Sequence, residues 1–197
     1  VIPAKRLKSA QWILDLLRKS EQKKPAFGCF GMHEWAMVYK SKNPRHSHLN
    51  MRMPPDELAR FVESRPLICT HFDAFRFFTR EAAPLNRNEL SRDTFMDNEQ
   101  AGCIHTNMDL YKWAFKLYPW ISSALILKAF ELACEARTID MQASPYDMRT
   151  FGLQAIPIET EHGRKQYLEA QMGIYEKSIP VRRSLIEAYE RLLGLAG

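Results

Sequence analysis

Hydrophobic positions near both ends of the chain follow the period of an amphipathic helix. Over residues 4–20 the lysines and arginines fall on one face and the apolar side chains on the other; the apolar members are Leu7, Ile13, Leu14 and Leu17. Such a face packs against a core while the charged face stays in water. The pattern therefore predicts a helix over residues 4–20 and helices again from about Thr160 to Gly194. Because proline lacks the backbone N–H, we expect Pro180 to divide this last stretch into two helices.

The two strongest helical patterns lie in the middle of the chain, over residues 106–118 and 122–140. The first carries a stripe of large side chains at helical spacing, namely Met108, Tyr111, Phe115 and Tyr118, and only one polar stripe. The second has a similarly broad apolar surface. Helices that are hydrophobic around most of their circumference are usually buried. We therefore expect both helices to be buried on most sides, with residues 122–140 as the central core helix.

The region between residues 26 and 98 is less regular. Residues 26–39 are rich in glycine and aromatic residues, which indicates a loop that turns into a short helix at about Met32. Asp56 is a good first residue for a helix over residues 57–64. Residues 79–98 are polar and predict a loop. This region is expected to cover one side of the helical core.

Two segments suggest β structure. Residues 49–53 alternate between apolar and polar side chains, the period of a half-buried strand. Residues 67–78 fit either a strand or a helix, and we favour a strand; a third short strand is expected near Ile156 and Ile158. The fold class predicted is mainly α, a single helical domain over residues 1–197 with a small adjunct β element, and an α+β fold is the alternative.

Length and composition agree with one domain. The chain has 197 residues, of which 46% are hydrophobic, enough for a core that needs no disulfide or metal. Its cysteines, Cys29, Cys69, Cys103 and Cys134, lie far apart among apolar neighbours and are expected to be buried, reduced thiols. No apolar run approaches the roughly 18 residues that cross a bilayer. We expect an intracellular protein of the cytoplasm or an organelle matrix, and Val1 in place of Met indicates truncation or processing.

Three histidines each have a carboxylate nearby: His33 with Glu34, His71 with Asp73, and His105 with Asp109. A carboxylate that accepts one imidazole N–H raises the basicity of the other nitrogen, which suits both general bases and metal ligands. His71, His105, Asp73 and Asp109 are therefore candidate catalytic residues. The histidines His33, His71 and His105 are candidate ligands of a divalent metal. Ordinary hydrogen-bonded histidines are the alternative.

Aromatic side chains accompany these histidines. Trp35, Tyr39, Phe72, Tyr111 and Trp113 could stack on a flat ligand, and Arg76 could hold an anionic group beside it. Packing in the core is the alternative for every one of these rings. The formal charge of +5 permits contact with nucleic acid, although the basic residues are dispersed along the chain. Phosphate-binding loops and the nucleophile elbow of serine hydrolases are missing from the sequence.

Four segments carry a resemblance to a known family: FGCFGMHEWAMVY at 27–39, HFDAFRFF at 71–78, MDLYKWA at 108–114 and ASPYD at 143–147. They resemble bacterial proteins, frequent in actinobacteria, that are labelled 3-methyladenine DNA glycosylase. The resemblance covers nearly the whole chain, and those proteins are longer at the N-terminus by a further His- and aromatic-bearing segment. It implies hydrolysis of the N-glycosidic bond of a damaged base.

That activity needs an aromatic pocket, a carboxylate beside the sugar and a basic rim for phosphates. Trp35 and Trp113, Asp73 and Asp109, and Arg76 and Lys112 are the residues that the resemblance suggests for these three roles. Two other functions stay open at this point. The protein is a metal-dependent enzyme with a His/carboxylate site, or it is a non-catalytic subunit whose exposed aromatics bind a protein partner in a larger assembly.

Overall fold

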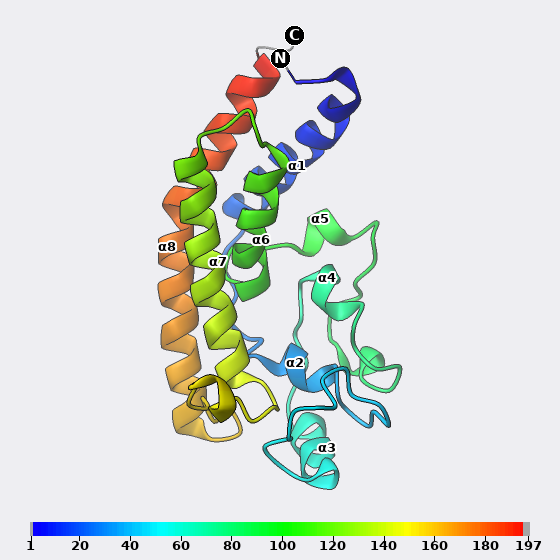
Figure 1. The fold of residues 1–197 in the computed structure, drawn as a ribbon. Coiled ribbons are helices and arrows are strands. Elements are labelled where there is room, and N and C mark those ends of the chain that lie inside the picture. Colours follow the sequence, from blue (N-terminus) through cyan, green and yellow to red (C-terminus); the bar gives the residue numbers. More distant parts are fainter. Residues whose placement is uncertain (1, 195–197) are drawn as a thin grey trace.

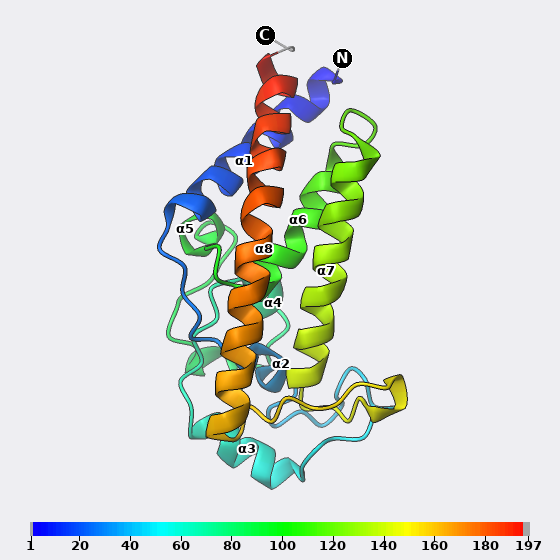
Figure 2. The same cartoon turned by 90° about the vertical axis from the view of Figure 1, so that its left-hand side faces the viewer.

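The computed structural model describes residues 2–194 of the chain. Its framework is a bundle of four long helices: α1 (Ala4–Gln22), α6 (Ile104–Lys116), α7 (Ser123–Ala143) and α8 (Glu161–Gly194). Helix α7 lies against α6 and α8, and α1 crosses the C-terminal half of α8 (Figures 1 and 2). Within residues 2–194 every regular element is a helix. This confirms the prediction of a mainly α fold.

Local sequence chemistry explains where the bundle helices form. Helix α7 follows Ser122, whose side-chain oxygen accepts a hydrogen bond from the Leu125 backbone N–H at 3.3 Å. Such a cap satisfies one of the free N–H groups of the first turn and contributes roughly 1 kcal/mol. Helix α1 buries one apolar face, as its pattern predicts: Ala10, Ile13, Leu14, Leu16 and Leu17.

Helix α8 corrects the expectation that Pro180 divides the C-terminal stretch. It is one continuous helix of 34 residues with Pro180 inside. The proline removes one hydrogen bond of the helix. Residues on either side of it are nevertheless buried, among them Ile174 and Leu185, and Tyr189 donates a hydrogen bond to the Trp113 carbonyl at 2.9 Å. Packing along α1, α6 and α7 therefore holds the helix together across the proline.

The irregular half of the molecule, residues 23–103, lies beside the bundle (Figure 1). It contains α2 (Met32–Ala36), α3 (Pro55–Glu63), α4 (Phe72–Phe75), η1 (Ala83–Leu85) and α5 (Phe95–Asn98), and η2 (Arg149–Phe151) lies in the connection from α7 to α8. The predicted helices near Met32 and after Asp56 are confirmed. The predicted loop over residues 79–98 contains two short helical turns, η1 and α5.

The predicted strands are wrong. Residues 49–53 make only an isolated antiparallel bridge between Met51 and Tyr146, and the residues near Ile156 form no strand in the described chain. The Arg52 N–H donates to the Pro145 carbonyl at 2.8 Å, but Pro145 has no N–H to return the bond. Residues 49–53 do alternate in polarity, but Pro145 in the opposite segment cannot donate the hydrogen bond that a longer antiparallel ladder would need here.

Residues 67–78 also differ from the strand that we favoured. Leu67 makes a single bridge to Asn86, and the chain then enters α4, with His71 in an extended conformation just before it. The Asn86 side chain accepts a hydrogen bond from the Cys69 N–H at 2.8 Å and donates to the Cys69 carbonyl at 3.1 Å. An amide side chain thus replaces a neighbouring strand here, which frees the backbone to turn at His71.

The stripe of large side chains that begins on α6 is buried only in part, contrary to expectation: Met108 and Tyr111 are half-buried. Phe115 is 58% exposed and Tyr118 is 60% exposed, and Leu127 and Phe130 on α7 are also exposed. The faces of α6 that pack against the bundle carry Leu110, Trp113, Ala114 and Leu117 instead. Both α6 and α7 therefore leave an apolar surface in contact with solvent. Cys134 on α7 is exposed as well and Cys29 is half-buried, which corrects the expectation of four buried thiols, although all four cysteines are free.

Among the described residues, none of the helices combines the length and the apolar character that crossing a bilayer requires. This agrees with the expectation from the sequence.

Candidate metal centre

Three histidines meet where the irregular half contacts the bundle. His33 lies on α2, His71 precedes α4 and His105 lies in the first turn of α6. The His105 ring is in the middle: its centroid is 4.4 Å from that of His33, edge to face, and 5.4 Å from that of His71, nearly parallel. The structure thus brings together the three histidines that the sequence singled out.

The first cluster, called here the His33 group, consists of His33, Glu34, His105 and Asp140. One ligand atom from each lies within 4.8 Å of all the others. His33 Nε2 is 2.7 Å from Asp140 Oδ1, and His105 Nε2 is 3.9 Å from Asp140 Oδ2. Asp140, the shared carboxylate, comes from α7 and is fully buried. Two imidazoles and two carboxylates therefore converge on one point.

Arg137 balances the negative charge of the His33 group. It lies one helical turn before Asp140 and reaches Asp140 Oδ2 at 2.7 Å and Glu34 Oε1 at 3.2 Å. Burial alone would raise the pKa of Asp140, but His33, His105 and Arg137 favour the carboxylate and hold that pKa well below its usual range. Burial and the neighbouring Asp140 raise the pKa of Glu34 to about 7. The two carboxylates thus have opposite tendencies to ionise.

Cys29 completes the surroundings of His33, and the sequence analysis missed this role. Its Sγ lies 3.2 Å from His33 Nδ1, so both ring nitrogens of His33 have a partner. The chain turns between the two residues through Phe30 and Gly31, which both have positive φ. A side chain at Gly31 would also meet Ala143 at 3.1 Å. The only sequence signal was the spacing of four residues between Cys29 and His33.

The second cluster, called here the His71 group, consists of His71, Asp73 and Asp109. His71 Nε2 faces Asp109 Oδ2 at 3.8 Å. Lys112 forms ion pairs with both carboxylates, at 3.1 Å to Asp73 Oδ2 and in close contact with Asp109 Oδ2. Although that contact is short, Asp109 Oδ2 accepts no well-aligned hydrogen bond from the described residues. Burial raises the pKa of Asp109.

Glu99 orients His71 from behind. His71 Nδ1 is 2.7 Å from Glu99 Oε1, and Thr106 donates a hydrogen bond to Glu99 Oε2 at 2.5 Å. All three side chains are buried. Burial would lower the pKa of His71, but Glu99 and Asp109 raise it above its usual value. A carboxylate on one nitrogen fixes the ring and leaves Nε2 available for a ligand or a proton.

The predicted histidine–carboxylate pairs are formed only in part. His33 and Glu34 share one group and His71 and Asp73 share the other, but Asp109 faces His71 rather than His105. His105 instead approaches Asp140. Two carboxylates that contact these histidines, Asp140 and Glu99, were absent from the sequence-based candidates. They lie 107 residues from His33 and 28 from His71, and no local pattern connects them.

The predicted stacking residues are mostly part of the core. Trp35 is fully buried and donates its indole N–H to the Ala143 carbonyl at 2.9 Å, and Tyr39 and Trp113 are buried too. Phe72 and Tyr111 are half-buried. Arg76 is exposed and lies 3.6 Å from Asp73. Trp35, Tyr39 and Trp113 therefore have no surface to offer a ligand.

Space at the site is narrow on the inside and open at the edge. His33 and His105 line an internal cavity of about 30 Å³ together with Cys29, Cys69 and Cys103. A cavity of that size holds about one water. Toward solvent, Asp73 and Lys112 are about one-third exposed and Arg137 is nearly half exposed. A substrate would therefore approach along the edge formed by these charged side chains.

Comparison of the chain with protein-family models, with curated proteins and with solved structures finds no match. The site is therefore interpreted from its own geometry.

Proposed function

We propose that this protein is a metal-dependent enzyme that binds one divalent transition metal ion in the His33 group. The observation that carries the proposal is the convergence of His33, His105, Asp140 and Glu34 at one buried point. Imidazole and carboxylate together are the donors that Zn²⁺, Fe²⁺ and Mn²⁺ accept in proteins. Donors about 2.0–2.1 Å from a tetrahedral zinc ion are about 3.4 Å apart. The separations from Asp140, 2.7 Å to His33 and 3.9 Å to His105, lie on either side of that value, so small side-chain movements would admit an ion.

Arg137 and Lys112 have a defined part in this proposal. Each cation pairs with two carboxylates and so weakens the repulsion between them. A metal ion in the His33 group would take over the neutralisation from Arg137. That guanidinium is half-exposed and could then turn toward an anionic substrate at the open edge.

We assign the acid–base work to the neighbouring His71 group. His71 has one nitrogen fixed by Glu99 and the other directed at Asp109. A metal ion polarises a substrate or lowers the pKa of a bound water, and a nearby imidazole can then accept or donate the proton. The predicted catalytic residues Asp73, Asp109, His71 and His105 fall into this arrangement, with His105 acting as a metal ligand.

Metal titration tests the proposal directly. The protein is stripped with a chelator, dialysed against Zn²⁺, Mn²⁺ or Fe²⁺, and its bound metal is measured by elemental analysis. We expect one ion per chain, lost in His105→Ala and Asp140→Asn and retained in His71→Ala. His162→Ala, which changes an exposed histidine, is the matched control. Circular dichroism of each variant shows whether it folds.

Two outcomes would contradict the proposal. One is a wild-type protein that holds no stoichiometric ion of any of the three metals. The other is an ion that is retained in folded His105→Ala and Asp140→Asn variants. If instead a second ion binds and is lost in His71→Ala, the His71 group is a metal site and its acid–base assignment is wrong.

We further propose a nucleobase of DNA as the substrate class of this site. The support is the resemblance described above, the net charge of +5, and the cations Arg76, Lys112 and Arg137 beside the carboxylates. Because the internal cavity holds about one water, the base would lie at the open edge, next to Asp73. The half-buried Phe72 and Tyr111 are the predicted stacking residues that are not fully buried.

An excision assay on alkylated DNA tests the substrate class separately from the metal. We expect the wild type to release a free base and Asp73→Asn and Asp109→Asn to release at least about tenfold less, because each loses a carboxylate that can stabilise the sugar cation. Asp93→Asn, at an exposed position, is the control. No released base at enzyme excess, from protein loaded with each metal, would contradict the substrate and leave the metal titration unaffected.

A further inference from the structure

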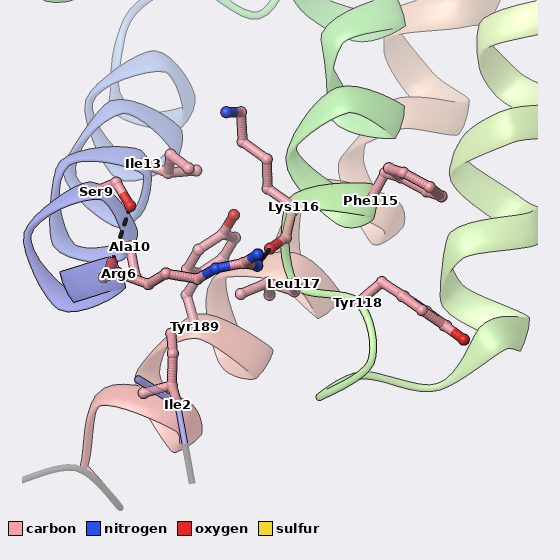
Figure 3. Close-up of a pocket in the computed structure, with 10 residues that line it drawn as sticks. All are labelled: Ile2, Arg6, Ser9, Ala10, Ile13, Phe115, Lys116, Leu117, Tyr118 and Tyr189. Atoms are coloured by element: carbon pink, nitrogen blue, oxygen red, sulfur yellow. Dashed lines mark hydrogen bonds between the residues drawn. The ribbon is translucent and has the colours of Figure 1, made fainter. Parts of the chain in front are cut away.

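A second surface with binding chemistry lies at the other end of α6, where α6 meets α1 and α8. It contains a cavity of about 490 Å³ (Figure 3). Its floor is apolar, from Ile13, Leu117 and Tyr189, and Arg6 and Lys116 lie at its rim. This cavity shares no residue with the His33 group or the His71 group. It therefore needs an explanation of its own.

The charge of this surface has one sign. Arg6 and Lys116 are both exposed, and among the described residues that line the cavity none carries a carboxylate. Arg6 is held in place, because its Nη1 donates to the Lys116 carbonyl at 3.5 Å and its guanidinium lies 5.1 Å from the Trp120 ring. Lys5 and Lys8, in the same part of α1, are also exposed. The surface is therefore complementary to an anion.

Two aromatic rings stand next to these cations. Phe115 and Tyr118 are more than half exposed, and their rings are almost parallel, with an interplanar angle of 10° and centroids 6.2 Å apart. Figure 3 shows the two rings one above the other on the side of Lys116 that faces away from Arg6. A centroid distance of 6.2 Å between nearly parallel rings lies within the range of offset stacking. Both rings are open to solvent, and their separation would create a slot between them.

We propose that this surface binds single-stranded nucleic acid, with one unpaired base inserted between Phe115 and Tyr118 and the adjoining phosphates paired with Lys116 and Arg6. Stacked bases are about 3.4 Å apart, so a base between two rings requires a ring separation of about 6.8 Å. The ring centroids are now 6.2 Å apart, in an offset arrangement. Because both side chains are exposed, the rings can move apart to admit a base.

A single strand fits this surface better than the other polyanions or apolar partners do. The bases of a duplex are already stacked and cannot enter a slot between two rings without unpairing. An apolar protein partner would cover the rings but would leave Arg6 and Lys116 unpaired. Sequence-tolerant single-strand sites combine aromatic platforms with basic side chains along the backbone, as here. The inference is independent of the metal ion and of the excision activity proposed above.

Fluorescence anisotropy with a labelled oligothymidylate tests the inference. We expect wild-type protein to bind it, and Phe115→Ala and Tyr118→Ala to bind about tenfold or more weakly through lost stacking. Tyr118→Phe keeps the ring and should bind as the wild type does. Phe151→Ala removes an aromatic residue that is equally exposed but distant from the slot, and it is the control for nonspecific losses.

Salt dependence tests the cations separately. Replacement of both Arg6 and Lys116 by alanine should reduce the slope of log affinity against log salt by about 1.4, the value for two phosphate contacts with a single strand. Oligouridylate in place of oligothymidylate distinguishes RNA from DNA, and either one supports the inference. Equal or tighter binding of the matching duplex, equal binding of thymidine monophosphate, or unchanged affinity in Phe115→Ala would overturn it.

Discussion

The His33 group and the His71 group surround adjacent histidines in different ways. His33 has a partner on each nitrogen, a thiol on Nδ1 and a buried carboxylate on Nε2. His71 has a carboxylate on Nδ1 only, and its Nε2 faces Asp109 at 3.8 Å, beyond hydrogen-bond distance. The first ring is tied into a charge network, whereas the second is fixed in orientation and keeps one nitrogen available.

We expect the two groups to have different roles, one in stability and the other in proton transfer. Charges in the His33 group compensate one another around the fully buried Asp140, so removal of this carboxylate leaves unpaired charge behind. The His71 group is more open, since Asp73 and Lys112 are about one-third exposed. Stability should therefore depend most on the His33 group. Proton transfer should depend most on the His71 group.

Loss of Asp140 is expected to have the largest effect on stability. In Asp140→Ala, His33 loses its carboxylate and Arg137 loses one of its two acceptors. Breaking a buried pair by removing one partner costs about 3–5 kcal/mol. Urea denaturation of the chelator-treated protein should show a decrease of that size. Asp97→Ala, at a side chain that is 74% exposed, should stay within about 0.5 kcal/mol of wild type.

A small effect of Asp140→Ala would contradict the comparison. It would mean that the His33 group is held together by the surrounding packing and not by its charges.

Loss of Glu99 should have the second-largest effect on the free energy of unfolding. Glu99→Ala removes the acceptor of both His71 and Thr106 in a buried place. Two hydrogen bonds to a charged group contribute about 3 kcal/mol together, and part of this is recovered if a water enters the space. We expect a decrease of about 2 kcal/mol in the free energy of unfolding.

The metal titration of Glu99→Ala sharpens this second prediction. Metal binding in the His33 group should be unchanged, because the Glu99 carboxylate bonds to His71 and Thr106, which are not members of that group. A large loss of metal in a folded Glu99→Ala variant would contradict the division of work between the two groups.

The sequence singled out the three histidines that the structure brings together, but not most of their partners. Periodicity predicted α1, α6 and α7, and thus the placement of His105 at the start of a helix. Each histidine's neighbours along the chain were then considered as partners. Asp140 and Glu99 approach from other elements, and the pairing follows from how α7 and the loop before α6 pack on the irregular half. A single sequence contains no record of that packing.

The expectation that the aromatic stripe of α6 is buried was wrong for a related reason. Helical spacing showed correctly that Tyr111, Phe115 and Tyr118 share a face. Spacing cannot show whether a neighbouring helix covers that face, and here α7 leaves Phe115 and Tyr118 exposed. An exposed apolar stripe and a buried one have the same sequence pattern.

The pH dependence of stability separates the carboxylates within the His33 group. The folded pKa of Glu34 is raised to about 7. Its pKa in the unfolded chain is near 4.3, so only the unfolded state loses this proton between these two values. Ionisation of Glu34 therefore opposes folding, and stability should fall as the pH rises from about 4.3 to 7.

Glu34→Gln tests this sign, because it removes the titrating group and keeps the shape. In the presence of a chelator, the urea midpoint of wild type should fall more between pH 5 and pH 8 than that of Glu34→Gln. Asp140 has the opposite sign: its lowered pKa contributes stability that is lost on acidification below the unfolded value of about 3.9. An equal fall in wild type and Glu34→Gln would contradict the assignment of Glu34.

Loss of Cys29 should have the smallest effect on stability. It tests the contact between the Cys29 thiol and His33, which the sequence analysis missed. Cys29→Ala removes the thiol from His33 Nδ1 and leaves the Asp140 contact in place. A single hydrogen bond contributes about 1 kcal/mol, and the adjoining cavity can supply a water as a substitute. We expect a change of about 1 kcal/mol or less in urea denaturation. A loss as large as that of Asp140→Ala would show that the thiol, and not only the carboxylate, balances the charge on His33.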